Sequence, residues 1–206
     1  FYTKIMDQTN MMRVYDDSQN SFTNFAMSGI DQRHMGIELG FKVPLPVQGL
    51  SVEGALSWGE YIYTSTPRMT QTVDNSAEVV HDNAYVPYWA SHPVYKKSVD
   101  GMGSVIYETD VNGNYIVEKN QKHYVPSTPQ LAADLGLNYR TNSYWFFEID
   151  AQYFANSYLD MNPLYRTDMA TAGPDGIATP MEIEYMTAQE KFDPVFLLNA
   201  SIGKSW

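Results

Sequence analysis

A chain of 206 residues is long enough for one domain of ordinary size. Hydrophobic residues make up 44% and charged residues 18%, and 16 Tyr, 9 Phe and 4 Trp make the chain too rich in aromatic residues for a disordered protein. The formal net charge of −11 excludes the basic surface that a nucleic-acid partner needs, and the absence of cysteine excludes disulfides, thiolate metal sites and cysteine nucleophiles.

Alternation of apolar and polar side chains predicts the strands. Successive side chains of a strand point to opposite faces, so a period of two gives one apolar face and one polar face. The pattern occurs at 34–43, 50–59, 131–140, 145–154 and 196–203. In chain order, the residues of the apolar faces are Met35, Ile37, Leu39, Phe41, Val43, Leu50, Val52, Gly54, Leu56, Trp58, Leu131, Ala133, Leu135, Leu137, Tyr139, Trp145, Phe147, Ile149, Ala151, Tyr153, Phe196, Leu198, Ala200 and Ile202. We therefore expect an all-β fold.

The connections between these strands are short and long in turn. Pro44 to Gly49 and Thr141 to Ser143 are tight turns, whereas 66–127 and 161–192 are long polar segments. Short turns on one side and long loops on the other are typical of antiparallel β-barrels in bacterial outer membranes.

Two turns are predicted inside the long segments. Asn112-Gly113 predicts a hairpin turn between 104–110 and 115–119, because both residues tolerate a positive φ. Asp175-Gly176 predicts a second turn by the same reasoning.

The lengths of the apolar segments favour strands as the only means of crossing a membrane. The longest apolar runs, 145–147 and 195–198, are far shorter than the about 20 residues of a spanning helix. Tyr139 and Trp145 flank a tight turn, and Tyr153 lies about 20 Å higher on a strand tilted by about 40°. That height is close to the apolar band of about 25 Å between the aromatic girdles of such barrels. A soluble β-sandwich, whose strands also alternate, is the alternative.

Three segments resemble strands of TonB-dependent transporters, especially those of Bacteroides-like bacteria. Arg33 to Leu39 contains Gly36-Ile37-Glu38 and is followed by a short turn. Gly49 to Ser57 alternates and leads to Tyr61 and Tyr63, and Phe192 to Lys204 resembles a late barrel strand.

This resemblance implies a partial transmembrane antiparallel β-barrel. Family barrels have about 22 strands and a plugged lumen, whereas residues 1–206 supply about six spanning strands. The resemblance thus implies that 1–206 is a fragment of the barrel domain, with the plug and two last strands elsewhere in the parent chain. It implies active uptake, across the bacterial outer membrane, of a large scarce nutrient such as a siderophore, vitamin, peptide or glycan.

The implied partners are outer-membrane lipid, the rest of the barrel with its plug, TonB acting through the plug, and a surface lipoprotein as a further candidate. We expect no cofactor, no metal and no catalysis. A passive porin-type barrel and a soluble all-β ligand-binding module are the alternative functions.

Five acids lie on the polar faces of the predicted strands and would face the lumen of a barrel: Glu38, Glu53, Asp134, Glu148 and Asp150. Barrel interiors are normally polar. We therefore expect these acids to pair with neighbouring cations such as Arg33 and Arg140, rather than to act on a substrate.

The first long segment carries the candidate ligand-binding residues. Its aromatic side chains Tyr85, Tyr88, Trp89 and Tyr95 could contact a substrate, or could pack the loop upon itself. His81, His92 and His123 lie in the same segment, but their spacing matches no metal signature.

Overall fold

The computed structural model describes residues 1–76, 78–126, 128–172 and 178–206. The strands are β1 Tyr2–Asp16, β2 Ser21–Pro44, β3 Leu50–Tyr63, β4 Arg68–Val73, β5 Val79–Tyr85, β6 Ser91–Tyr95, β7 Lys97–Val99, β8 Val105–Tyr107, β9 Val117–Lys122, β10 Leu131–Arg140, β11 Trp145–Ala155 and β12 Val195–Lys204. The helical elements are η1 Leu164–Arg166, α1 Asp168–Thr171 and α2 Pro180–Thr187. The expectation of an all-β, antiparallel fold is confirmed.

Within the described residues, eight strands form one antiparallel sheet in the order β12-β11-β10-β3-β2-β4-β5, with β1 on the other edge of β2. The β1 strand pairs with β2 over Ser21 to Met35. The far part of β2, from Gln32 to Pro44, pairs with β3. This sheet is open, since β12, β5 and β1 each have a strand on one side only.

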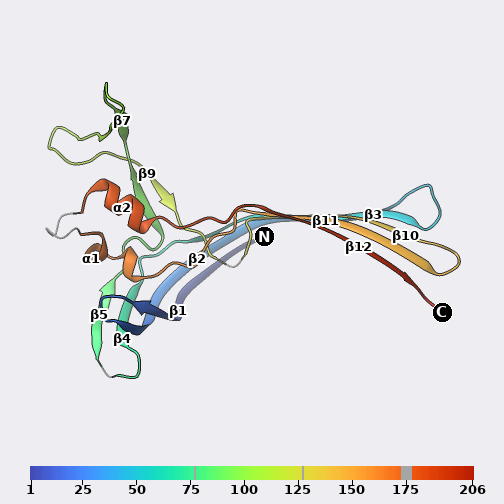
Figure 1. Cartoon of the computed structure of the whole chain (residues 1–206), viewed down its shortest axis with the longest axis horizontal. Coiled ribbons are helices and arrows are strands. Elements are labelled where there is room, and N and C mark those ends of the chain that lie inside the picture. Colours follow the sequence, from blue (N-terminus) through green and yellow to red (C-terminus); the bar gives the residue numbers. More distant parts are fainter. Residues whose placement is uncertain (77, 127, 173–177) are drawn as a thin grey trace.

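The sheet has two different ends (Figure 1). The tight connections β2–β3 and β10–β11 lie at one end, together with the C-terminal end of β12, and we call this the turn end. The small strands β4 to β9 and the helices gather at the opposite end, which we call the loop end. The two tight turns predicted from the sequence thus lie at one end and the two long segments at the other, whereas the short β1–β2 turn, which the sequence did not predict, lies at the loop end.

The register of the five long strands aligns their faces. Leu39 lies opposite Leu56, which lies opposite Ala133, and this row continues across the sheet through Tyr153 to Phe196. Val43, Val52, Leu137, Ile149 and Ala200 form a parallel row nearer the turn end. The five apolar faces predicted from alternation are therefore one continuous face. We call residues 36–44, 50–58, 131–140, 145–154 and 195–204 the two-faced sheet.

A glycine in β2 moves the apolar side chains to the other face near the loop end. Gly29 has a φ of +74°, and the pairing of β1 with β2 shifts register around it. Such an irregularity adds a residue to one strand and reverses the alternation that follows. Phe25, Met27 and Ile30 consequently share one buried cluster, although Phe25 and Met27 have odd numbers and Ile30 has an even number.

That cluster is the core of the protein, and it lies at the loop end. Its other members are Tyr63, Met69, Val86, Trp89 and Met161, so the segments following β3, β5 and β11 all contribute. Tyr63 lies on the same face of β3 as Glu53, because both have odd numbers in one regular strand. The loops therefore pack on the side of the polar face, and none of the described residues covers the apolar face of the two-faced sheet.

The hairpin predicted at Asn112-Gly113 is present at its tip. Asp110 N donates to Asn114 O at 2.8 Å, and Thr109 pairs with Tyr115. Its arms then separate, because β8 pairs with β7 and β9 pairs with β6. The turn predicted at Asp175-Gly176 lies outside the described residues.

Among the described residues, none of the helices has the length and apolarity needed to span a membrane.

Candidate functional site

Most of the large side chains on the apolar face of the two-faced sheet are exposed, from the turn end to the row of Leu39 and Phe196. Leu135 is 56% exposed in the middle of β10, which is paired on both sides, and Leu198 is 66% exposed in the middle of the edge strand β12. Monomeric soluble proteins rarely expose a contiguous apolar surface of this extent. An exposed apolar surface of this extent is typical of a face that contacts another protein, a ligand or a membrane.

Aromatic side chains mark the turn end of this face. Tyr139 stacks near Phe147, and Phe147 stacks near Trp145, with ring centroids 6.2 Å and 6.5 Å apart. Lys204 lies opposite Trp145 in the register, and its Nζ lies 5.5 Å from the centre of the Trp145 ring. A lysine beside aromatic rings is the usual composition of the boundary between lipid and water.

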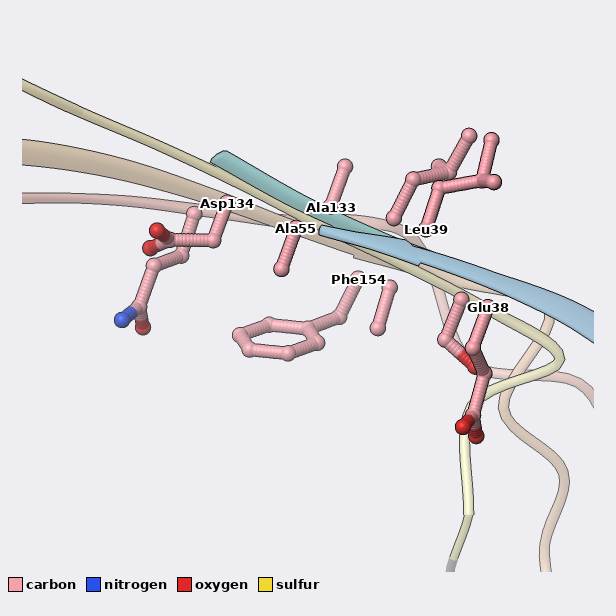
Figure 2. Close-up of a pocket in the computed structure, with 10 residues that line it drawn as sticks. Glu38, Leu39, Ala55, Ala133, Asp134 and Phe154 are labelled. Carbon is pink, nitrogen blue, oxygen red and sulfur yellow. The ribbon is translucent and has the colours of Figure 1, made fainter. Parts of the chain in front are cut away.

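The opposite face carries the five acids predicted to face a lumen. Figure 2 shows Leu39 and Ala133 on one side of the strands, and Glu38, Asp134 and Phe154 on the other. A shallow hollow of about 410 Å³ is lined mainly by residues of this second side, including Ala55, Ala132 and Gln152. The structure brings the acids to a common face, but spreads them over strands β2, β3, β10 and β11.

Neighbouring strands satisfy three of the five acids. Glu53 pairs with Lys42 at 2.8 Å, Asn199 Nδ2 donates to Asp150 at 2.8 Å, and Ser201 Oγ donates to Glu148 at 3.3 Å. Glu53 thus pairs with a neighbouring cation as expected, but the cation is Lys42; Arg33, one of the two cations named from the sequence, pairs with Glu60 nearer the loop end. These bonds explain the acids as parts of a polar wall.

The four aromatic residues proposed to contact a substrate do not form a common surface. Trp89 is 2% exposed and packs against Tyr63, with 5.1 Å between ring centroids. The prediction that Trp89 contacts a substrate is therefore wrong, because Trp89 is a core residue. Tyr88 and Tyr95 are partly buried, and burial raises the pKa of both phenols.

Tyr85 is the exposed member of the four, at 58%. The guanidinium of Arg68 lies over its ring, 3.7 Å from the centroid, so one face of the ring is already covered. No ring contact joins any two of the four residues in the described part of the chain.

The fold brings together two of the three loop histidines. His92 Nδ1 lies 2.7 Å from His123 Nε2, and His123 Nδ1 lies 3.0 Å from Trp89 O. Both histidines are buried, and burial together with the His92 neighbour lowers the pKa of His123 to about 3. Among the described residues, no three His, Cys, Asp or Glu side chains are grouped so that they could hold a metal ion.

Sequence reasoning missed a hollow of about 620 Å³ at the loop end, between the segments 159–166 and 185–190. The buried Arg166 lines it. The sequence does contain a signal for the helix beside this hollow, since Thr179-Pro180-Met181-Glu182 is a helix-capping sequence that predicts the start of α2.

No family model, no curated protein and no solved structure matches this chain.

Proposed function

We propose that this chain forms part of the wall of a transmembrane β-barrel in a bacterial outer membrane. The observation that carries the proposal is the continuous apolar face of the two-faced sheet, which no part of the described chain covers. Removing apolar surface from water gains about 25 cal/mol per Å². Contact with lipid would remove the whole apolar face from water and so provide this free energy for all its side chains.

The opposite face supports the same proposal. A soluble sandwich would place a second sheet on the apolar face and leave the polar face to water. Here the long loops pack on the polar side instead, around Phe25, Tyr63 and Trp89. In a barrel this arrangement would place the loops over the mouth of the lumen, and the apolar face would be free to meet lipid.

The open edges of the sheet are consistent with a partial barrel. Backbone N–H and C=O groups at an edge have no partners in hydrocarbon, so a sheet in a membrane must close upon itself. The free edges of β12 and β1, together with the part of β2 from Ile37 to Pro44 that pairs with β3 alone, would pair with further strands of the parent barrel. In this proposal the loop end faces the cell exterior and the turn end faces the periplasm.

We propose further that the barrel is a TonB-dependent transporter. The support is the resemblance of 33–39, 49–57 and 192–204 to strands of that family. A plug domain would close the lumen, TonB would act on the plug, and the present chain would supply wall and outer loops. Its described residues would carry out no chemistry.

The wall and its orientation can be tested by cysteine labelling, which is clean because the chain has no native thiol. Ser76 is exposed at the loop end and Ser143 is exposed at the turn end. On intact cells, an impermeant maleimide should label Ser76→Cys and leave Ser143→Cys unlabelled until the outer membrane is opened. Labelling of Ser143→Cys alone would invert the orientation, and equal labelling of both in a soluble fraction would exclude the membrane.

The transport proposal needs a separate experiment. Site-specific photocrosslinking between TonB and the full-length protein in living cells should give an adduct that requires the TonB-contacting segment. A protein that is inserted in the outer membrane but gives no adduct would be a passive barrel.

A further inference from the structure

An arginine at the loop end is buried and forms no ion pair with any of the described residues. Arg166 is 6% exposed and lines the hollow between 159–166 and 185–190, which we call the Arg166 pocket. Its Nη2 donates to Ala188 O at 2.7 Å and its Nη1 donates to Asn162 O at 3.4 Å. No carboxylate among the described residues lies within ion-pair distance of its guanidinium, and its buried Nε has no hydrogen-bond partner.

This guanidinium is poorly compensated. Backbone carbonyls are neutral, and burying a charge without an opposite charge is costly. Burial lowers the pKa of Arg166 to about 10, although the charge of Glu190 opposes that change. The group remains a cation at neutral pH, and Nη1 and Nη2 each make only one of the bonds above, so an anion in the pocket would gain charge-assisted hydrogen bonds from their remaining N–H groups.

The walls of the pocket narrow the choice of anion. Asp160 and Glu190 also line the pocket, and both are exposed. These two rim carboxylates lie beyond ion-pair distance of the guanidinium, and they would repel a polyanion such as a phosphate ester and attract an ammonium group. A ligand that complements both the positive charge of Arg166 and the negative charges of Asp160 and Glu190 carries one carboxylate and one amine.

The remaining surface is aromatic and apolar. The side chains of Tyr165, Tyr185 and Leu159 line the same pocket and are exposed. Gln189 contributes little to recognition, because its amide is already bonded to both the N–H and the C=O of Tyr124. A neutral sugar could stack on the tyrosines, but its hydroxyls would leave the guanidinium uncompensated.

We propose that the Arg166 pocket binds short zwitterionic peptides, with the C-terminal carboxylate on Arg166 and the amino terminus beside Asp160 and Glu190. Apolar peptide side chains would lie against Tyr165 and Tyr185. A role of this pocket in capturing cargo for import rests on the proposed function, whereas peptide binding itself does not.

The test is titration calorimetry on the full-length protein in detergent, with the tripeptide Ala-Leu-Ala as the probe. The free acid should bind, and its C-terminal amide should bind about 10- to 100-fold more weakly, because one charge-assisted bond is lost. Acetylating the amino terminus should weaken binding by a smaller factor. Equal affinity for acid and amide, or binding of maltotriose without binding of the peptide, would overturn the proposal.

Two variants and one control assign the contacts. Arg166→Met removes the buried charge with little change in volume and should abolish the difference between acid and amide. If Arg166→Met does not fold, Glu190→Gln still decides the matter, because this rim residue should lose part of the preference for the free amine over the acetylated peptide. Glu118→Gln, on the exposed strand β9, should bind all probes as the unchanged protein does.

Failure of this proposal and failure of the proposed function give different results. A protein that cysteine labelling places in the outer membrane, but that does not distinguish acid from amide, would remove only the peptide site. A protein that binds the peptide through Arg166 but is absent from the outer membrane would retain the site and lose the barrel.

Discussion

Leu135 provides the most direct residue-scale test of the two faces. It lies midway along β10, with Gly54 and Ala151 opposite it on the neighbouring strands, and its side chain is on the apolar face. In a membrane, Leu135→Arg near the midplane should lower the free energy of unfolding by about 2–4 kcal/mol. Urea unfolding of the protein in lipid vesicles would measure this loss.

Gln152 is the matched control for that substitution. It lies opposite Asp134, one position away from Leu135 in height, and it lines the hollow on the polar face. Gln152→Arg places the same cation beside a carboxylate and should cost less than about 1 kcal/mol. Similar losses for the two variants would contradict the assignment of the faces.

The buried histidine pair predicts a pH dependence at the loop end. The pKa of His123 is about 3 in the folded protein, against about 6.5 for an exposed histidine. Between those values only the unfolded loop binds the proton, so the stabilisation is complete above about pH 6.5 and is lost progressively as the pH falls to about 3. Arg166 and Lys119 also disfavour a charge on His92, whereas Glu184 favours it.

Hydrogen exchange of β6 and β9 would measure this dependence, after correction for the intrinsic exchange rate at each pH. Protection should fall between about pH 6.5 and about pH 4. His123→Asn can retain a donor to Trp89 O but does not titrate, so its protection should change much less. Identical pH profiles for the two proteins would remove His123 as the cause.

At the scale of elements, the turn between β2 and β3 depends on one glycine. Gly49 has a φ of +80°, and a Cβ there would lie 1.9 Å from Arg140 O. Its carbonyl also accepts a hydrogen bond from Arg140 N at 2.8 Å, so the turn is held against the end of β10. The contact and the conformation both exclude a side chain.

Gly49→Ala should therefore lower the free energy of unfolding by about 2 kcal/mol or more. Gly40→Ala is the control in the adjacent strand, since a Cβ at Gly40 meets nothing closer than Gly54 O at 3.9 Å. That control should stay within about 0.5 kcal/mol of the unchanged protein. Equal effects in a urea titration would show that the turn relaxes around an added methyl group.

The helix α2 shows how a local signal acts together with its surroundings. Thr179 accepts a bond from Glu182 N, and the Glu182 side chain accepts one from Thr179 N, as a capping box requires. The start of α2 depends only on neighbouring residues and can be predicted from the sequence. The burial of Ile183 and Thr187 depends on the segments packed against the helix, which the sequence does not reveal.

For the whole molecule, the exposed apolar face and the open edges act together. Residues 1–206 expressed alone in buffer should aggregate, because the apolar face associates and the edges of β12 and β5 offer unpaired backbone groups. Size-exclusion chromatography with light scattering would measure this, and detergent should reduce the aggregation by covering the face. A monodisperse, cooperatively unfolding monomer in plain buffer would contradict the assignment of this face to lipid.

The sequence by itself determined the two-faced sheet and its tight turns. Its signal is a period of two over about ten residues, which backbone geometry converts directly into two faces. The bounds of β10, Leu131–Arg140, agree with the prediction, and Lys204 takes its place beside Trp145 at the end of the apolar face. Strands β4 and β5 escaped prediction because their alternation is short, and only the second half of β2 was predicted, because the alternation reverses at Gly29.

Only the tertiary structure decided what the long loops contain. His92 and His123 are 31 residues apart and meet because β6 pairs with β9, while Arg166 is buried because segments on both sides of α2 enclose it. From the sequence alone, Trp89 could be a ligand contact or a core residue; its contact with Tyr63 in the folded chain shows that it is a core residue. These features depend on which distant segments pack together. The free energy of that packing comes from contacts between residues far apart in the sequence, so the local alternation of apolar and polar residues does not predict it.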